Sequence, residues 1–574
     1  MVMENSLMKN AIKVMIFTFL MAVLLIHFSC NVSHGTADLK FEYADPLEKV
    51  LAEASYFPAR EAVSEVVRGE HATLQFVVRS PYSIRDLKVS VSQAESEGNM
   101  LPAAKTGFVG FVKVGRTIWD YSRDRIVSAS GYYPDPVLEQ ESIDVDFGNA
   151  QPIWVSIPVP ADATAGLYKG SITITGVNGK KKFKIAKDYT VKVYPVTVGK
   201  TSLWVTNWFS LSPSQLRWMN NGDLFEEYSD QHWEYIRTLA RKMAEYRQNI
   251  AIIPPLYLSE FRYDNGKWSI DFSRFDRVVE IFIQEGVIGR IEGGHIGGRE
   301  STWISQFVVS VPSKEVYPEI KFRALPVSDP EAQEFYKEFL PALNNHLKER
   351  GWDNIYMQHL ADEPIEENIK SYIEIASFVR KLVPDFKFID ACHSKNLGGV
   401  LDIWVPQLDF MDRDYEFYNS QNKKGKEAWF YTCLSPKGEY VNRFIELPLL
   451  KTRYMHWVNY KYNIPGYLHW GLNYWNRWDP FGEQTAIQYE GGNVLPGGDS
   501  WIIYPKNGKL FSSIRYDAMR DGIVDYELFR MLEKKDSVKA KELVNRVIYK
   551  FDRYDNNIEA FRENRRHLME MLSQ

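Results

Sequence analysis

Short apolar runs alternate with amphipathic helical patterns from residue 201 to residue 510. This alternation strongly constrains the fold, because strands that are joined through helices lie parallel in a sheet. The helical patterns are clearest at 233–246, 275–284, 332–348, 369–382 and 450–460. The apolar runs are rich in β-branched and aromatic residues and fall at 203–209, 250–256, 289–294, 355–360, 387–391, 403–408, 428–433 and 466–471. Eight such strands predict a (β/α)8 TIM barrel.

The main alternative is a doubly wound open sheet. Such a sheet usually carries a Gly-rich phosphate-binding turn after its first strand, and no such turn follows the run at 203–209. The extra length of the repeat falls in the third loop, around 300–326, and in the eighth, from 476 to 508. We therefore expect the barrel.

The chain on either side of the repeat has a different character. Alternating strand patterns at 73–79, 152–158, 170–175 and 189–194 predict an N-terminal β-sandwich. Residues 512–574 are helical and highly charged. The predicted multidomain α/β plus β fold therefore has a β-sandwich at 38–197, the (β/α)8 barrel at 201–510 and a C-terminal helical segment at 511–574, packed on the barrel.

The N-terminus has the pattern of an export signal. Lys9 and Lys13 precede an apolar run at 14–26, which is too short for a permanent transmembrane helix. We expect a signal peptide at 1–30, and Ser29-Cys30 resembles a loose lipobox that would lipidate Cys30. Cleavage near Ala37 is the alternative. The expected location is the periplasm, or the outer membrane as a lipoprotein, of a Gram-negative bacterium.

Charge and aromatic content indicate the kind of partner. Lys and Arg number 69 against 74 Asp and Glu, so the net charge of -5 argues against a nucleic-acid partner. Aromatic residues make up 14% of the chain and include 16 Trp, concentrated after residue 200. Exposed Trp and Tyr suit sugar rings, although core packing is the alternative for any one of them.

One of the apolar runs ends at two adjacent acids. Asp362 and Glu363 follow the run at 355–360 and precede Pro364. The proline breaks the strand and is expected to hold Glu363 in an extended conformation. The alternative is that the pair caps the following helix, since acids are favoured at helix N-termini.

Active sites of such barrels form at the carboxyl ends of the strands. The residues there combine acids, amides, histidines and aromatics, as a glycosidase pocket requires. No metal is expected, because the histidines show no paired spacing. No G-x-S-x-G elbow occurs, and Cys433 lies in an apolar run, so a serine or cysteine nucleophile is not expected. The strand-end residues are Asn207, Trp208, Pro254, Pro255, Gly293, Gly294, His295, Asp362, Glu363, Asp390, His393, Gln407, Tyr431, Trp470, Asn473, Tyr474 and Trp475.

Adjacent carboxylates favour one mechanism among glycosidases. Most of these enzymes take their two carboxylates from separate strands. Adjacent acids fit a substrate-assisted mechanism better, in which the 2-acetamido oxygen of the substrate attacks the anomeric carbon. One carboxylate then orients the acetamido group while its neighbour protonates the leaving oxygen.

The layout resembles glycoside hydrolase family 123. The resemblance rests on the sandwich and barrel, on Gln358-His-Leu-Ala-Asp-Glu-Pro364, on the aromatic run Tyr467 to Trp475, and on Ser513 to Ile523, which is less specific. It implies an exo-acting, retaining β-N-acetylgalactosaminidase that acts through an oxazolinium intermediate on terminal β-linked GalNAc of glycosphingolipid-type glycans. Family 20 β-hexosaminidases share the acidic pair, but theirs follows Gly-Gly, whereas Leu360-Ala361 stands here.

The resemblance also implies roles for the strand-end residues. Glu363 would be the general acid and then the base, with a raised pKa, and Asp362 would stay ionised and hold the acetamido N–H. Tyr431 would bond the acetamido oxygen. No cofactor is implied. The other substrate-binding candidates are Asn207, His295, Trp429, Tyr467, Trp470, Asn473, Trp475 and, as indirect support, Arg515.

Two alternative functions stay open at this point. A GlcNAc-preferring β-hexosaminidase would use the same mechanism. A non-catalytic surface glycan-binding lipoprotein would need the aromatics but not the two acids.

Overall fold

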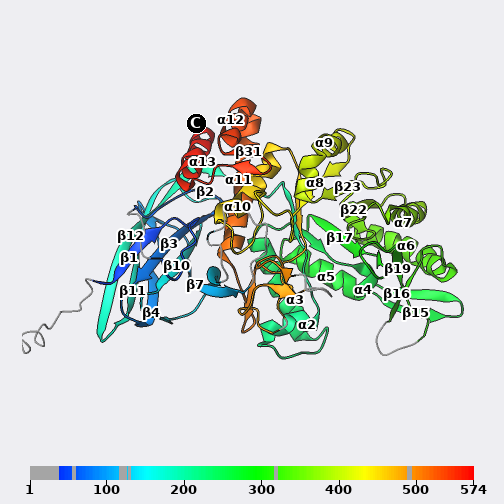
Figure 1. Ribbon diagram of the computed structural model, residues 1–574, viewed down its shortest axis with the longest axis horizontal. Coiled ribbons are helices and arrows are strands. Elements are labelled where there is room, and N and C mark those ends of the chain that lie inside the picture. The colour runs from blue at the N-terminus through cyan, green and yellow to red at the C-terminus, as the bar shows by residue number, and fades with distance from the viewer. Residues whose placement is uncertain are drawn as a thin grey trace, which may run out of the picture.

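The computed structural model describes residues 38–54, 60–115, 126, 131–315, 321–476, 478–487 and 494–574. The expected signal peptide at 1–30, its Cys30 and the alternative cleavage point near Ala37 lie outside the described residues. A β-rich part lies at one end of the molecule and an α/β part at the other (Figure 1). No helix within these described ranges is both long and apolar enough to cross a membrane.

The β-rich part consists of two packed sheets. One has the strand order β1-β3-β10-β7-β8 and the other β2-β12-β11-β4-β9, to which the short β5 and β6 are added. Alternate residues of β12 point inward, so that Tyr189, Val191 and Val193 are buried between the sheets. The strands are β1 Lys40–Ala44, β2 Val63–Arg68, β3 His71–Arg79, β4 Ile84–Val91, β5 Glu95–Ser96, β6 Asn99–Met100, β7 Lys105–Val114, β8 Gly131–Leu138, β9 Ile143–Val145, β10 Ala150–Pro158, β11 Gly166–Asn178 and β12 Lys181–Thr197.

The central part contains parallel strands at all eight of the predicted places. They form a three-stranded sheet, β13-β26-β25, and a six-stranded sheet, β14-β17-β21-β22-β23-β24. The seventh predicted strand is split, and its two pieces pair in different sheets. The strands are β13 Trp204–Asn207, β14 Ile250–Ile252, β17 Arg290–His295, β21 Tyr356–His359, β22 Lys387–Cys392, β23 Ile403–Pro406, β24 Glu427–Ala428, β25 Phe430–Tyr431 and β26 Gly466–His469. A closed TIM barrel is not confirmed, because the strand pairings of the described residues give two sheets and not one ring.

Helices follow most of these strands. The Asp329 side chain caps α6 by accepting from the Glu331 N–H, and Gly351 ends it in the left-handed conformation. The longer helices are α3 Asp230–Glu245, α5 Ser273–Gln284, α6 Pro330–Arg350, α7 Ile369–Leu382 and α10 Leu449–Lys461. The short ones are α2 Pro213–Leu216, η2 Arg217–Asn220, α4 Pro255–Leu258, α8 Leu408–Arg413 and α9 Tyr415–Lys423. The helix predicted at 369–382 is confirmed with the same bounds as α7.

The loops after the strands carry small antiparallel sheets. After β14 the chain forms the hairpin β15 Glu260–Asp264 and β16 Lys267–Asp271. After β17 it forms a three-stranded sheet of β18 Gly297–Arg299, β19 Phe307–Pro312 and β20 Phe322–Leu325. After β26 come two hairpins, β27 Ala486–Ile487 with β28 Val494–Leu495, and β29 Tyr504–Lys506 with β30 Lys509–Phe511. The third and eighth loops are thus the long ones, as the sequence predicts.

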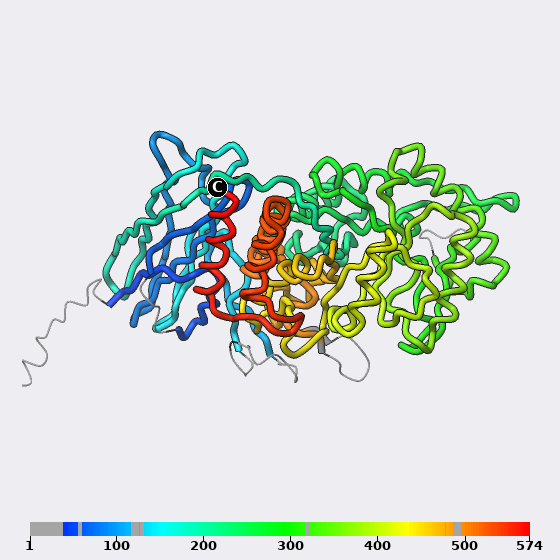
Figure 2. The backbone as a smooth tube through the Cα atoms, turned by 90° about the horizontal axis from the view of Figure 1, so that it is seen from above, coloured from blue at the N-terminus to red at the C-terminus, as the bar shows by residue number. Residues whose placement is uncertain are grey.

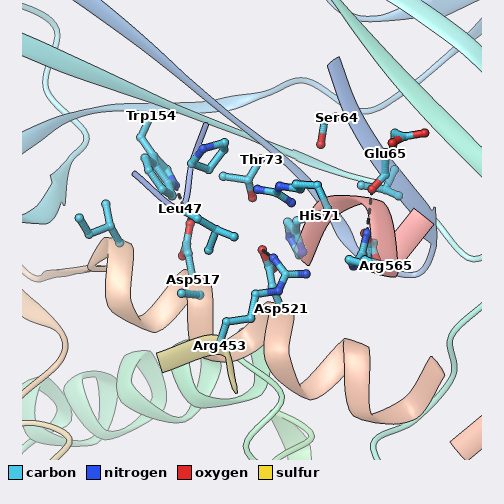
Figure 3. A pocket seen from close by; sticks show the side chains of 16 residues that line it. Leu47, Ser64, Glu65, His71, Thr73, Trp154, Arg453, Asp517, Asp521 and Arg565 are labelled. Carbon is cyan, nitrogen blue, oxygen red and sulfur yellow. Dashed lines mark hydrogen bonds and ion pairs between the residues drawn. The ribbon is translucent and has the colours of Figure 1, made fainter. Parts of the chain in front are cut away.

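The C-terminal elements join the two larger parts. They are α11 Ile514–Lys535, α12 Ser537–Val547, β31 Ile548–Lys550, β32 Arg553–Tyr554 and α13 Ile558–Ser573. Helix α11 packs against α10, and α13 lies beside β12 of the sandwich (Figures 1 and 2). Between the sandwich and α11, the Trp154 indole donates to Asp517 at 2.7 Å (Figure 3). Between the sandwich and α13, Arg565 donates to Glu70 at 2.8 Å. The cavity there measures about 30 Å³, so it has room for little more than a water molecule.

Candidate active site

The acidic pair lies just beyond the carboxyl end of β21. The strand ends at His359, and Leu360 and Ala361 separate it from Asp362 and Glu363. The next helix, α7, has Asn368 as its N-cap. The pair therefore does not cap a helix, and its position is that of a loop at a strand end.

Glu363 has a left-handed backbone, with φ at 50°. The expectation of an extended conformation before Pro364 was therefore wrong. Tertiary hydrogen bonds fix the residue instead: its N–H donates to the Ala391 carbonyl at 3.1 Å, and its carbonyl accepts from Arg299 at 2.7 Å. Such a conformation is costly for a residue with a side chain and is typical of functional sites.

The carboxylate of Glu363 faces two donors. The Tyr431 hydroxyl donates to its Oε1, and His393 Nε2 lies 3.3 Å from the same atom. His393 Nε2 is also 2.8 Å from the Tyr431 hydroxyl. Burial by itself raises the pKa of Glu363, but the hydrogen bond and charge of His393 and the bond from Tyr431 outweigh it and lower the pKa.

Asp362 has a different environment from its neighbour. Its Oδ1 lies 4.0 Å from His295 Nε2, and 46% of its side chain is exposed. Although the side chain is about half exposed, the protein groups around the carboxyl remove part of its water, and this desolvation, together with the charge of Glu363, raises the pKa of Asp362 to about 6. The order of the two pKa values in this structure is thus the reverse of the expected one, because the two strong donors lie beside Glu363.

A buried chain of polar side chains lies behind Asp362. The Trp208 indole donates to Glu292 at 2.6 Å, His359 Nε2 is 3.4 Å from Glu292, and His359 Nδ1 is 2.8 Å from Asp390. Burial alone would lower the pKa of His359, but the hydrogen bonds to Asp390 and Glu292 raise it to about 9. His359 is therefore an imidazolium held between the Asp390 and Glu292 carboxylates. Asp390 also lies 3.4 Å from His295 Nε2.

The same cluster contains a set of potential metal ligands. His295, His359 and Asp390 offer donor atoms within 4.8 Å of one another. Spacing along the chain did not indicate this group, because its members come from three different strand ends. A metal would need His359 to give up a carboxylate partner, whereas a chain of charged hydrogen bonds satisfies both of its nitrogens as they stand.

The predicted aromatic residues divide into two groups. Tyr431 contacts the acidic pair, and Trp470 is partly exposed, with its indole donating to Asp499 at 3.2 Å. The other three, Trp429, Tyr467 and Trp475, are buried, and each bonds through its polar atom to another protein group. The described contacts of these three residues do not reach the pair.

The predicted polar residues are mostly used within the protein. His295 lies beside Asp362, but Asn207 and Asn473 are buried and bond through both their amide oxygen and nitrogen to protein groups. Arg515 is buried in α11 and forms a two-pronged ion pair with Asp135 of the sandwich. Its contribution to the site is therefore at most indirect.

Other residues of the site had no assigned role in the sequence. His393 was among the strand-end residues, and the spacing along the chain could have identified it. Glu292 follows the alternation of β17, but it precedes Gly293 and Gly294, which the sequence places at the end of the strand. Arg299 belongs to the third loop, whose path no local pattern predicts, although it contacts the backbone of Glu363.

Comparison with known families identifies the family of this chain. The family model described as "Glycoside hydrolase 123, catalytic domain" matches residues 211–532, more than half of the 574 residues. The chain belongs to glycoside hydrolase family 123. The N-terminal domain model of family 123 matches residues 57–176. As a member of family 123 the protein is a glycoside hydrolase.

A solved family 123 structure shares the fold. It is described in an account of glycolipid glycan hydrolysis by a family 123 glycoside hydrolase from Clostridium perfringens. Its TM-score is 0.70 at 16% identity, over 94% of this chain and 97% of that chain. A termite-gut GH10 xylanase with a bacterial Ig-like domain aligns at a TM-score of only 0.31 and 12% identity, over 65% of this chain and 90% of that chain. No curated protein matches.

Proposed function

We propose that this family 123 hydrolase is an exo-acting, retaining β-N-acetylgalactosaminidase with a substrate-assisted mechanism. The observation that supports this most directly is the adjacency of Asp362 and Glu363 on one loop, with their carboxyls facing different neighbours. Two carboxyls from one loop are poorly placed to flank a sugar from opposite faces, as a protein nucleophile and an acid must. The nucleophile would then come from the substrate.

The reaction proceeds in two steps. In the first, Glu363 gives its proton to the glycosidic oxygen, the bond from C1 to that oxygen breaks, and the acetamido oxygen bonds to C1 to form an oxazolinium. Asp362 accepts the acetamido N–H and stabilises the positive charge. In the second, Glu363 takes a proton from water, and that water attacks C1 and opens the oxazolinium ring. The β-configuration is therefore retained.

Substrate binding must move a proton within the pair. When the free pair holds one proton, at a pH below about 6, that proton resides mainly on Asp362, which has the higher pKa. An acetamido N–H beside Asp362 favours its charged form, and two adjacent carboxylates repel each other. If the Tyr431 hydroxyl turns to the acetamido oxygen, Glu363 also loses a donor. Both changes transfer the proton to Glu363, where the reaction needs it.

The preference for GalNAc and for glycosphingolipid-type glycans rests on the sequence resemblance. The Clostridium perfringens enzyme, described for glycolipid glycan hydrolysis, supports a glycan of that kind. We also propose export to the periplasm, or to the outer membrane through lipidated Cys30, on the pattern at residues 1–30. Metabolic labelling with a fatty acid, lost in Cys30→Ala, tests the lipid.

We propose further that the two parallel sheets are arcs of one (β/α)8 TIM barrel. The Asn249 N–H donates to the Val205 carbonyl at 3.3 Å, which links β13 to the segment before β14. The consecutive strands β24 and β25 belong to different sheets, one to each, and only Trp429 separates them. An experimental structure that leaves an open edge at β13 would contradict the barrel.

A panel of aryl β-glycosides tests the proposed activity. We expect the aryl β-GalNAc substrate to be cleaved faster than its GlcNAc, Gal and Glc counterparts. A thiazoline analogue of cyclised GalNAc should inhibit competitively. Faster cleavage of the GlcNAc substrate would change the assigned sugar, and a sugar ester trapped on Asp362 would rule out the substrate-assisted mechanism.

A further inference from the structure

Two consecutive apolar side chains are exposed at the tip of the loop between β18 and β19. Trp303 is 49% exposed and Ile304 is 60% exposed. Their loop is part of the long third loop, which the sequence predicts to carry extra residues. The proposed reaction assigns no role to this loop. An exposed indole at the rim of a site commonly marks a binding surface.

The tip is held in place and does not hang free. Arg299 Nε and Asn368 Nδ2 both donate to the Trp303 carbonyl, at 2.8 and 3.3 Å. The Thr302 N–H donates to the Ser305 hydroxyl at 2.9 Å. Several side chains are thus used to fix one exposed tryptophan, which reduces the entropy lost when a ligand binds to it.

The residues that hold the tip also hold the acidic pair. The Arg299 guanidinium stacks over the Trp303 ring at 3.8 Å and donates to the Glu363 carbonyl at 2.7 Å. The amide oxygen of Asn368 accepts from the Ile365 N–H at 2.9 Å, within the segment that follows the pair. The tryptophan is therefore positioned relative to the catalytic loop itself.

The indole lies on the Glu363 side of the pair. Its ring is 5.7 Å from the His393 ring, and His393 Nε2 is 3.3 Å from the Glu363 carboxylate. Asp362, which would hold the acetamido group, lies instead beside His295. Since Glu363 would protonate the glycosidic oxygen, the group beyond that oxygen lies on its side of the site.

We propose that Trp303 is the platform of the leaving-group subsite, where the C–H face of the sugar that leaves stacks on the exposed indole. The inference rests on the proposed function and names the class of the leaving group, which is a pyranose sugar. A flat apolar surface with polar neighbours suits a pyranose, whose faces are apolar and whose edges carry hydroxyls. The Arg299 guanidinium covers one face of the indole and supplies such a polar group, so the sugar would stack on the other face.

The test compares two substrates that differ only in the leaving group. One is a disaccharide with terminal β-linked GalNAc, and the other is methyl β-GalNAc, which lacks a second sugar. The quantity measured is the ratio of kcat/KM for the disaccharide to kcat/KM for the methyl glycoside. We expect Trp303→Ala to lower this ratio about tenfold, as the loss of an aromatic stack predicts, and Trp303→Phe to retain most of it.

Phe147→Ala is the matched control. Phe147 is an aromatic residue of the sandwich with 71% exposure, so its removal should leave the ratio unchanged. Thermal unfolding of each variant checks that the fold is intact. An unchanged ratio in Trp303→Ala, or an equal change in Phe147→Ala, would contradict the proposal that the leaving sugar stacks on Trp303.

The two proposals fail in different ways. If the wild-type protein cleaves β-GlcNAc and not β-GalNAc substrates, the sugar assignment fails. The same ratio of kcat/KM values, measured with the corresponding GlcNAc disaccharide and methyl glycoside, then tests whether Trp303 binds the leaving sugar. If it cleaves neither pair, both proposals fall. If it cleaves a pair and the Trp303→Ala ratio is unchanged, only the platform fails.

Discussion

At the scale of single residues, the two acids of the site are neighbours in sequence but differ in environment. Tyr431 and His393 stabilise the charge of Glu363, whereas the His295 ring nitrogen is 4.0 Å from the Asp362 carboxylate. The two carboxyls lie close enough to titrate as a pair. Below a pH of about 6, where the pair holds one proton, the higher pKa of Asp362 places that proton on Asp362.

The acid role of Glu363 predicts a dependence on the leaving group. Glu363→Gln should lower kcat for alkyl and natural glycosides about 10²- to 10⁴-fold, because no proton reaches the leaving oxygen. Aryl glycosides with acidic phenols should lose much less, since their leaving groups need little protonation. Steady-state kinetics over a series of aryl leaving groups measures the difference. An equal loss on every substrate would argue against an acid role for Glu363.

The shared proton predicts the pH profile. The free pair loses its proton as the pH rises through about 6, so kcat/KM should fall above that pH. His393 lowers the pKa of Glu363, so His393→Gln should make the pair bind its proton more tightly and move the basic limb to higher pH. His346→Gln is the control. His346 lies on α6 and pairs with Asp276 of α5, so its replacement should not move the basic limb. A basic limb that moves down in His393→Gln contradicts the electrostatic account.

At the scale of elements, the sequence run Ser513 to Ile523 forms the first half of α11. Helix α10, against which it packs, is buried along nearly its whole length. The two helices approach closely at Gly522, where an added Cβ would lie 2.5 Å from the Arg453 carbonyl oxygen. The run thus encodes a contact between two helices.

This contact predicts an unusual sign for a glycine substitution. Gly to Ala inside a helix ordinarily stabilises a protein by up to about 1 kcal/mol. Gly522→Ala should instead lower the free energy of unfolding by about 1–3 kcal/mol, because the methyl group forces α10 and α11 apart. Denaturant unfolding followed by circular dichroism measures the change. A more stable variant would show that the helices can separate without cost.

At the scale of the whole molecule, charged groups connect the sandwich to the C-terminal helices. Arg565 of α13 bonds Asp525 of α11 at 2.7 Å and Glu70 of the sandwich at 2.8 Å. Burial opposes the charge of Asp525, but Arg453 and Arg565 lower its pKa to about 2. Removing Arg565 would leave two buried acids without this partner.

Neighbouring arginines on α13 allow a matched test of this connection. Arg565→Met should destabilise the protein by about 3–5 kcal/mol, the usual cost of breaking a buried ion pair. Arg566→Met should cost less than about 1 kcal/mol, because Arg566 is 44% exposed and its pair with Glu65 is screened by water. Thermal and urea unfolding of both variants gives the comparison. Equal effects would mean that the buried network does not stabilise the docking of the sandwich.

Local patterns were sufficient for the central parallel strands and the longer helices, but not for the small antiparallel sheets in the loops. The bounds of α7 follow from helical periodicity, and the eight parallel strands follow from β-branched apolar runs bounded by turns. The acidic pair was recognisable because its two members are adjacent in the chain. For the same reason the family resemblance could be read from three short runs.

Contacts between distant parts of the chain needed the tertiary structure. Trp429 and Tyr431 lie in one predicted strand, yet the first is buried in the interior and the second reaches Glu363. The direction of the Glu363 pKa shift depends on His393, which follows another strand, and the Trp303 tip depends on the path of a long loop. Periodicity records how a residue relates to its neighbours in the chain. Packing decides which side chains from separate elements meet, and it therefore determined the electrostatics of the site.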